Sequence, residues 1–175
     1  MSTHSIVGIP YGDGFRGRYV HCDGYPSYQA RVLEELVQRD GRDQVVKVLT
    51  YENYGWSFLD PNHGPDIDHE MYRDGRFRAV AGYGLAYTDT VLDFGGREYQ
   101  QTNEAEWWPN DNGDYCYAEW AYVLTPQGHM GVFVIDGRYD ETTRTLTYKP
   151  TLIDFFPLDG SVDWKEIEDQ VYARF

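Results

Sequence analysis

The stretch Gly17-Arg18-Tyr19-Val20-His21-Cys22-Asp23-Gly24-Tyr25-Pro26 is the most informative part of the chain, because it predicts where a strand ends and a helix begins. A strand is expected over residues 15–22. Asp-Gly and Tyr-Pro then break it, as such pairs do in turns. Ser27 is the predicted N-cap, since its hydroxyl can accept a free backbone N–H of the first helical turn. A helix follows from about Tyr28 to Arg39, where apolar residues recur on one face.

Outside this stretch the same patterns predict a mixed fold. Strands are expected at 5–9, 77–88, 115–124, 129–135 and 145–153, and helices at 43–50, where a strand is the alternative, and at 161–173, with Ser161 as its cap. The strand at 115–124 is apolar on both faces and should be central, whereas Pro150 favours an edge position for the last strand. We therefore predict one α+β domain over residues 1–175, with a largely antiparallel sheet and two to three helices on one face.

Composition restricts the classes of partner. The chain has 175 residues and a formal net charge of −14, and no Lys or Arg occurs between Glu98 and Gly137. Nucleic-acid binding is not expected, because it requires basic surface that displaces counterions. A basic protein partner is compatible with the charge. No apolar run is long enough for a membrane helix, and Cys22 and Cys116 are expected to be reduced thiols, so a cytoplasmic protein is predicted.

The first candidate site is a pocket for a small anionic ligand at the end of the strand. It consists of Arg16, Arg18, His21, Asp23 and Tyr25. Arginines bind anions, and the start of a helix offers free N–H groups. The alternative is that residues 23–26 only form a turn and that His21 is a structural, half-buried residue. Catalysis by His21 as a general base or Cys22 as a nucleophile is less favoured.

The same segment carries a resemblance. Together with Val32-Leu33 on the predicted helix, it resembles the N-terminal signature of a family of small bacterial and phage proteins. That signature reads His-Trp-Asp-Gly-Tyr-Pro, and Cys22 stands here in place of its tryptophan. A looser likeness covers Gly82–Asp89 and Glu119–Leu124. The family has no established activity, so the resemblance implies a phage or accessory-gene context and no catalytic residues.

Two further segments are candidates. Residues 60–70 contain His63, His69 and several carboxylates that could hold a divalent metal, but the six-residue spacing of the histidines matches no usual zinc motif, and a solvated loop is the better interpretation. A partner-binding surface is predicted in the acidic, tryptophan-containing loop, made of Glu104, Glu106, Trp107, Trp108, Asp111 and Asp114. The alternative is that one tryptophan caps the core and the other covers a loop.

These features favour a small acidic binding protein without a cofactor or metal. It would engage, and in a phage setting inhibit, a basic host protein, or it would sequester a small anionic ligand. The alternative is a small metal-dependent hydrolase that uses His21, Asp23, His63 and His69. The binding protein is preferred because no Walker loop, GxGxxG, GxSxG, HExxH or CxxC motif is present.

Overall fold

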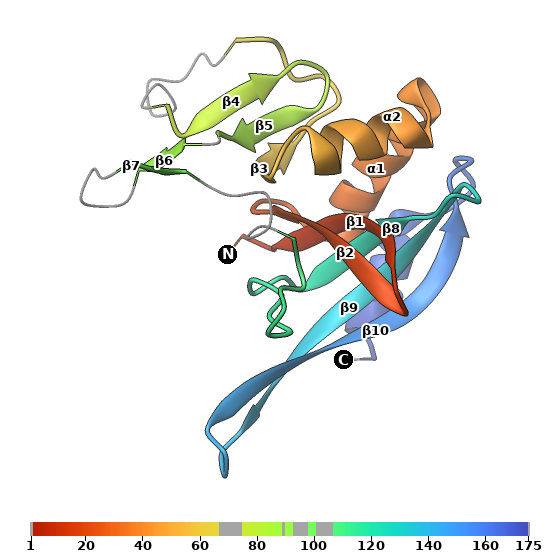
Figure 1. Ribbon diagram of the computed structural model, residues 1–175. Helices are drawn as coiled ribbons and strands as arrows, with labels where there is room; N and C mark the ends of the chain where they lie inside the picture. The colour runs from red at the N-terminus through yellow and green to blue at the C-terminus, as the bar shows by residue number, and fades with distance from the viewer. Residues whose placement is uncertain (1, 67–74, 89, 93–97, 101–106, 175) are drawn as a thin grey trace.

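A computed structural model describes residues 2–66, 75–88, 90–92, 98–100 and 107–174 (Figure 1). Its main sheet has eight strands in the order β10-β9-β8-β1-β2-β3-β5-β4, and β6 pairs separately with β7. The strands are β1 (Ser5–Tyr11), β2 (Gly14–Val20), β3 (Gly55–Leu59), β4 (Phe77–Val80), β5 (Gly84–Tyr87), β6 (Thr90–Leu92), β7 (Glu98–Gln100), β8 (Trp120–Leu124), β9 (His129–Asp140) and β10 (Thr145–Pro157). The helices are α1 (Pro26–Asp40), α2 (Arg42–Val46), the π-helix η1 (Lys47–Tyr51) and α3 (Trp164–Tyr172).

The predicted α+β class is confirmed, with all helices on one face of the sheet. The main core combines residues of α1, α2, η1 and α3 with alternate strand residues such as Tyr122 and Leu124. A smaller core on the opposite face contains the intervening residues Ala121 and Val123, and it has no helix residue. Helices α1 and α3 accordingly lie on the same side of the sheet, where the Trp164 indole of α3 donates to Glu34 of α1. No helix in the described part of the chain is long and apolar enough to cross a membrane.

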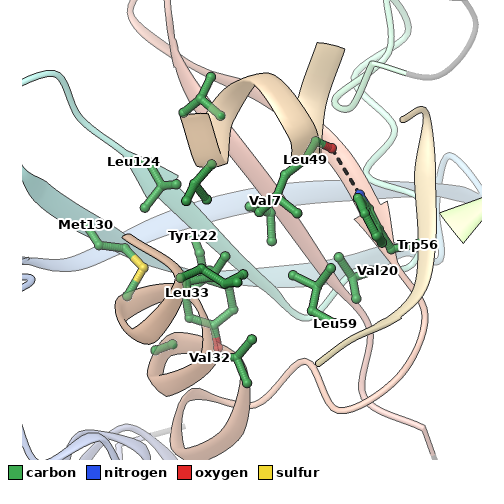
Figure 2. Close-up of a cluster of buried hydrophobic side chains, with 14 of the residues drawn as sticks. Val7, Val20, Val32, Leu33, Leu49, Trp56, Leu59, Tyr122, Leu124 and Met130 are labelled. Atoms are coloured by element: carbon green, nitrogen blue, oxygen red, sulfur yellow. Dashed lines mark hydrogen bonds between the residues drawn. The ribbon is translucent and has the colours of Figure 1, made fainter. Parts of the chain in front are cut away.

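Figure 2 shows how η1 is attached to the main core. The fully buried indole of Trp56 donates a hydrogen bond from Nε1 to the carbonyl of Leu49, at 3.0 Å. The Leu49 side chain is itself buried in the main core. The contact gives the indole N–H the partner that a buried donor requires. Residues 43–50, for which a strand was the alternative, are helical, since they belong to α2 and η1.

Both predicted helix caps are wrong. Helix α1 begins at Pro26 with Tyr25 as N-cap, and no side chain caps it. Proline suits the first helical position because it has no N–H to leave unpaired. Ser27 lies inside the helix, and its N–H donates to Glu168 of α3 at 2.9 Å. Helix α3 is capped by Asp163 rather than Ser161, with its carboxylate accepting two backbone N–H groups.

The last helix is held to α1 by a buried carboxylate. Glu34 is 7% exposed, and its two oxygens accept hydrogen bonds from the Gly160 N–H and the Trp164 indole, each at 3.0 Å. Charged acceptors make stronger hydrogen bonds than neutral ones. The pair of bonds therefore fixes the turn before α3 as well as the helix.

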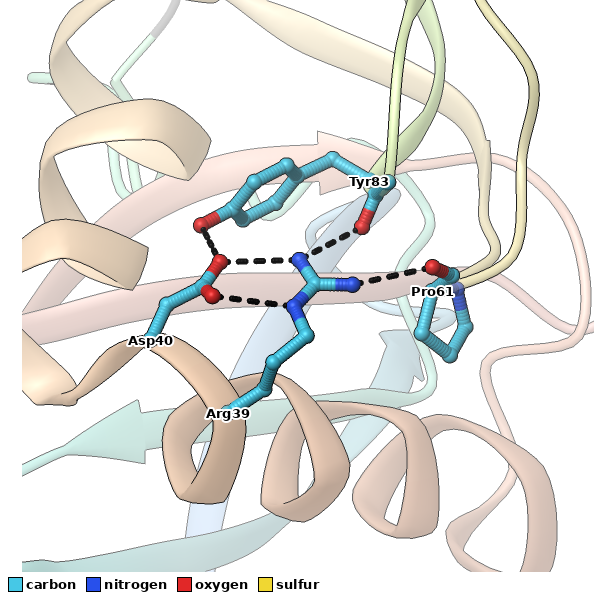
Figure 3. Close-up of polar contacts among 5 residues, drawn as sticks. Arg39, Asp40, Pro61 and Tyr83 are labelled. Atoms are coloured by element: carbon cyan, nitrogen blue, oxygen red, sulfur yellow. Dashed lines mark hydrogen bonds and ion pairs between the residues drawn. The ribbon is translucent and has the colours of Figure 1, made fainter.

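The C-terminal end of α1 carries a second polar network, shown in Figure 3. Arg39 donates to both oxygens of Asp40, at 2.9 and 2.8 Å, and also to the carbonyls of Pro61 and Gly82. The Tyr83 hydroxyl donates to the same carboxylate. These bonds connect the helix to the loop after β3 and to the turn between β4 and β5.

The strand prediction is confirmed in part. The predicted strand at 77–88 is two strands, because residues 81–83 form a turn with Gly82 at a φ of 77°. β3 was not predicted. The strand predicted at 115–124 begins only at Trp120, and it is central, between β9 and β1. The last strand lies at the edge, as Pro150 indicates. Two strand pairs, β1–β8 and β2–β3, are parallel.

Candidate functional site

Trp107 lies between the two arginines of β2. Its ring is 4.3 Å from the Arg16 guanidinium carbon and 3.7 Å from that of Arg18. Both distances are well inside the range of cation–π attraction. We call Arg16, Trp107 and Arg18 the Arg–Trp stack. Residues predicted to belong to two separate sites, one for a ligand and one for a partner, are thus brought together.

Backbone pairing holds the tryptophan in this position. The N–H of Gly17 donates to the Trp108 carbonyl at 2.8 Å, and the Trp108 N–H donates back at 2.9 Å. Gly17 faces Gly8 of β1, and a Cβ on Gly17 would lie 2.3 Å from the Val7 carbonyl oxygen. A larger residue would therefore displace β1 or the loop. Glycine at this position keeps β2 close to both neighbours.

Arg18 is the interior member of the stack. Its side chain is fully buried, and Nε donates to the carbonyl of Thr50 in η1 at 2.7 Å. The Tyr54 ring lies 5.3 Å away. A buried guanidinium needs such partners, because desolvation of a charge is costly. Arg18 therefore connects β2 to η1 and is not accessible to a ligand.

Arg16 is the accessible member. It is partly exposed, and its guanidinium carbon lies 4.4 Å from the Tyr11 ring. Its Nε has no hydrogen-bond partner, and within the described residues no carboxylate pairs with it. By contrast, Arg31, Arg39, Arg42 and Arg138 each form an ion pair with a carboxylate. The positive charge of Arg16 is balanced by aromatic ring faces rather than by an acid.

Two exposed tyrosines border the stack. Tyr11 is 59% exposed and Tyr51 is 51% exposed, and the Tyr51 ring meets Trp107 edge-on at 5.8 Å. The sequence analysis missed both. Tyr11 could have been found from the hairpin register, because Ile9 pairs with Arg16 and Tyr11 is the diagonal neighbour on the same face. Tyr51 has no comparable signal, since η1 brings it there from another part of the chain.

His21 is not brought together with the arginines. Successive residues of a strand point to opposite faces, and Tyr19 and His21 lie on the face away from Arg16 and Arg18. The Tyr19 hydroxyl is 2.8 Å from His21 Nδ1, and the His4 ring stacks on His21 with centroids 4.6 Å apart. Burial of the ring, followed by the nearby His4, lowers the pKa of His21. Burial likewise raises the pKa of Tyr19, so the phenol stays protonated.

The remaining residues of the first candidate site belong to the turn. Asp23 is exposed and has a φ of 55°, which is the left-handed region that Asp and Asn tolerate in turns. Tyr25 occupies the N-cap position of α1, and its ring lies 6.2 Å from that of Tyr28. Turn and cap geometry therefore accounts for both residues.

The acidic loop is divided between the two faces of the sheet. Trp108 packs against the smaller core, and the Asp114 carboxylate accepts the Cys116 N–H at 2.9 Å. Asp111 is exposed. Glu104 and Glu106 lie outside the described residues. Each of the two tryptophans is half-buried against its own side of β2, so the pair does not form a common exposed surface.

The cysteines and the loop that contains His63 form neither a reactive thiol site nor a metal site in the described residues. Cys22 and Cys116 are both free thiols, and burial raises the pKa of Cys116 to about 11, which keeps it protonated at neutral pH. His63 packs edge-on against Phe58 at 5.4 Å, and His69 lies outside the described residues. In the part of the chain that the structure describes, no three His, Cys, Asp or Glu side chains are grouped to hold a metal.

The Arg–Trp stack with its tyrosine rim is therefore the candidate site that the geometry supports best. It offers one accessible guanidinium, a half-buried indole and two exposed phenol rings. No protein-family model matches the sequence, and neither a curated protein nor a solved structure is significantly similar to this chain.

Proposed function

We propose that this protein is a non-enzymatic binding protein that holds a small anionic, ring-containing ligand at Arg16. The observation that carries the proposal is the guanidinium of Arg16, which lies between the rings of Tyr11 and Trp107 without a carboxylate partner in the described structure. A guanidinium can bind a carboxylate or phosphate through two parallel hydrogen bonds. The exposed faces of Tyr11 and Tyr51 would stack on the ring of the ligand.

The negative net charge of the whole molecule restricts where an anion can bind. A chain of net charge −14 repels anions in general. An anion would be attracted only where positive charge is accessible, and Arg16 provides such a charge without a carboxylate partner in the described structure. A basic protein partner is supported less well, because Trp107 and Trp108 are each packed against the sheet. We also propose a cytoplasmic location, which the two free thiols support because they suit a reducing compartment.

Thermal-shift measurements test this proposal. We expect a nucleoside monophosphate to raise the melting temperature more than inorganic phosphate does, because only the former has a ring to stack. Arg16→Gln should weaken binding at least tenfold, which corresponds to about 1.4 kcal/mol. Arg31→Gln is the matched control, since Arg31 is an exposed arginine of α1 that already pairs with Glu35.

The variants also separate ligand binding from folding. Arg16→Gln should leave the melting temperature of the free protein nearly unchanged, whereas Arg18→Gln should lower it strongly, because it leaves the Thr50 carbonyl without its charged donor. If Arg16→Gln binds the nucleotide as tightly as the wild-type protein does, the site lies elsewhere. If no compound of a nucleotide, phosphate and carboxylate panel stabilises the wild-type protein, the proposal is wrong.

A further inference from the structure

The hairpin of β9 and β10 has one face without any charged side chain. The two strands have 12 and 13 residues, and their register pairs Tyr139 with Leu146 and Phe133 with Leu152. Cross-strand partners point to the same face of a sheet. We call this face the outer face of the hairpin, and it consists of His129, Gly131, Phe133, Ile135, Gly137, Tyr139, Leu146, Tyr148, Pro150, Leu152, Phe155 and Pro157.

The contacts at two glycines support this assignment. A Cβ on Gly137 would lie 3.3 Å from the Tyr148 ring, and one on Gly131 would lie 2.9 Å from the Phe155 ring. The aromatic rings therefore lie over the glycines on the same side of the ribbon. Pairing continues beyond the bulge between Leu152 and Asp154, where the register shifts by one residue, so that Phe155 pairs with Gly131. Charged side chains of the two strands are confined to the other face, at Asp136, Arg138, Asp140, Lys149 and Asp154.

The outer face is covered by the rest of the chain only in its middle. There Phe133 packs against Phe15 at 4.9 Å, and Tyr148 packs against Tyr115 at 6.1 Å. The other apolar side chains remain open, with exposed fractions of 61% for Tyr139, 48% for Leu146, 42% for Leu152 and 47% for Phe155. They are half of the eight large exposed hydrophobic residues in the described structure. In Figure 1 the end of the hairpin projects away from the helices.

We infer that the outer face is the interface of a homodimer. Uncovered apolar patches of this kind mark interaction sites. The distribution of charge on the chain indicates which partner binds to this one. Residues 129–157 carry four acids and three bases, a net charge of −1 within a chain of −14, and the outer face itself carries none. The hairpin side chains of this face offer a basic partner no carboxylate, and Asp114 lies near Tyr148 in the middle of the face, which the chain itself covers. A second copy can approach here, where contact removes apolar surface from water without bringing acidic side chains together.

Strand-to-strand extension of the sheet is disfavoured. β10 is the edge strand, but Pro150, Lys149 and the bulge after Leu152 all interrupt a regular open edge. Such features block edge pairing in natural sheets. The two hairpins would therefore pack face to face, in a closed pair related by a two-fold axis. This arrangement places the outer faces of the two copies against each other.

The size of the face sets the expected affinity. The outer face from Leu146 to Phe155 is about 30 Å long and two strands, or about 10 Å, wide, and the rest of the chain covers its middle. Its area is on the order of 300 Å² per copy, which is below the roughly 800 Å² of a standard stable interface. The dimer should accordingly be reversible, with a dissociation constant in the micromolar range.

Sedimentation velocity with the full chain tests this inference, over protein concentrations from about 1 μM to about 200 μM. The wild-type protein should shift from monomer to dimer. Leu146→Glu combined with Leu152→Glu should remain monomeric, because two carboxylates per copy would be buried against each other. Thr147→Glu combined with Thr151→Glu is the matched control, since these exposed neighbours point to the other face, and it should dimerise like the wild-type protein.

Circular dichroism establishes that each variant is folded. If the glutamate pair unfolds the chain, the milder Leu146→Thr and Leu152→Thr pair should still raise the dissociation constant at least tenfold. A wild-type protein that stays monomeric up to the highest concentration, or a dimer unaffected by either outer-face pair, overturns the inference. The thermal stabilisation by ligand that depends on Arg16 should persist in the monomeric variant, so each proposal can fail without the other.

Discussion

Arg16 and Arg18 show how much the surroundings of a residue decide its role. Both lie on the same face of β2, and both touch Trp107. Arg18 is covered by η1 and bonds to Thr50, whereas Arg16 lies near the turn between β1 and β2 and remains partly exposed. The sequence shows two arginines at a spacing of two residues. It does not show which of them the π-helix covers, because that depends on long-range packing.

Gln29 offers a test of core energetics at the residue scale. Its side chain is fully buried in α1, and neither its Nε2 nor its Oε1 has a hydrogen-bond partner. An unsatisfied buried amide costs about 1–3 kcal/mol. Gln29→Met keeps the volume and removes the polar atoms, so we expect the free energy of unfolding in urea to rise by about 1 kcal/mol.

The matched control is Gln38→Met on the same helix. Gln38 is exposed and donates to the Leu158 carbonyl at 3.4 Å, so this change should not stabilise the protein. A loss of stability in Gln29→Met would contradict the prediction, and would mean that water or a neighbouring group satisfies the amide in solution.

The elements that local sequence patterns specify were predictable, and those that depend on tertiary contacts were not. The apolar stripe of residues 28–39 and the hairpin around residues 125–128 are local signals, and the structure contains both elements. β3 was missed because its ladder partners, β2 and β5, come from different parts of the chain. His21 is separated from Arg16 for a local reason, because the two residues are five positions apart and successive residues of a strand point to opposite faces.

Asp40 provides a prediction about the attachment of α1. Hydrogen bonds from Arg39, and then from Tyr83, lower the pKa of Asp40 to about 2. A carboxyl group with a lowered pKa in the folded state stabilises the protein above its ordinary pKa near 3.8, and this contribution is lost as the pH falls towards 2. Because the group is partly exposed to solvent, we expect a contribution of about 1 kcal/mol.

Urea denaturation from pH 6 down to pH 2 would measure the contribution of Asp40 to the free energy of unfolding. Asp40→Asn should be less stable than the wild-type protein at pH 6, and the difference should shrink below about pH 4. Asp43→Asn is the control, because the Asp43 side chain is 95% exposed and its pair with Arg42 is solvated. A difference between Asp40→Asn and the wild-type protein that stays constant with pH would show that the carboxylate charge is not responsible.

At the scale of the whole molecule, the net charge of −14 opposes the compact state. Like charges on a folded surface repel one another, and added salt screens this repulsion over distances beyond about 10 Å at 0.1 M. The two charges of a local pair such as Arg39 and Asp40 lie far inside that distance, so salt weakens their attraction less. Salt should therefore stabilise the protein as a whole.

We expect the melting temperature to rise by about 3 °C between low salt and about 0.2 M sodium chloride, which corresponds to roughly 1 kcal/mol for a chain of this size. Calorimetry or circular dichroism would measure the shift. Potassium fluoride at equal ionic strength is the control, since screening depends on ion charge and not on ion identity. A melting temperature that falls with salt would mean that attractive pairs outweigh the repulsion.

The position of β1 in the sheet has a consequence for synthesis on the ribosome. β1 pairs on one side with β2, which follows immediately, and on the other side with β8, in a parallel register of Ser5 with Trp120. At roughly 5–20 residues per second, β8 is made about 5–20 s after β1. Throughout that interval the nascent chain carries an apolar strand with one unpaired edge, so newly made protein should depend on chaperones that shield such edges until β8 has been made.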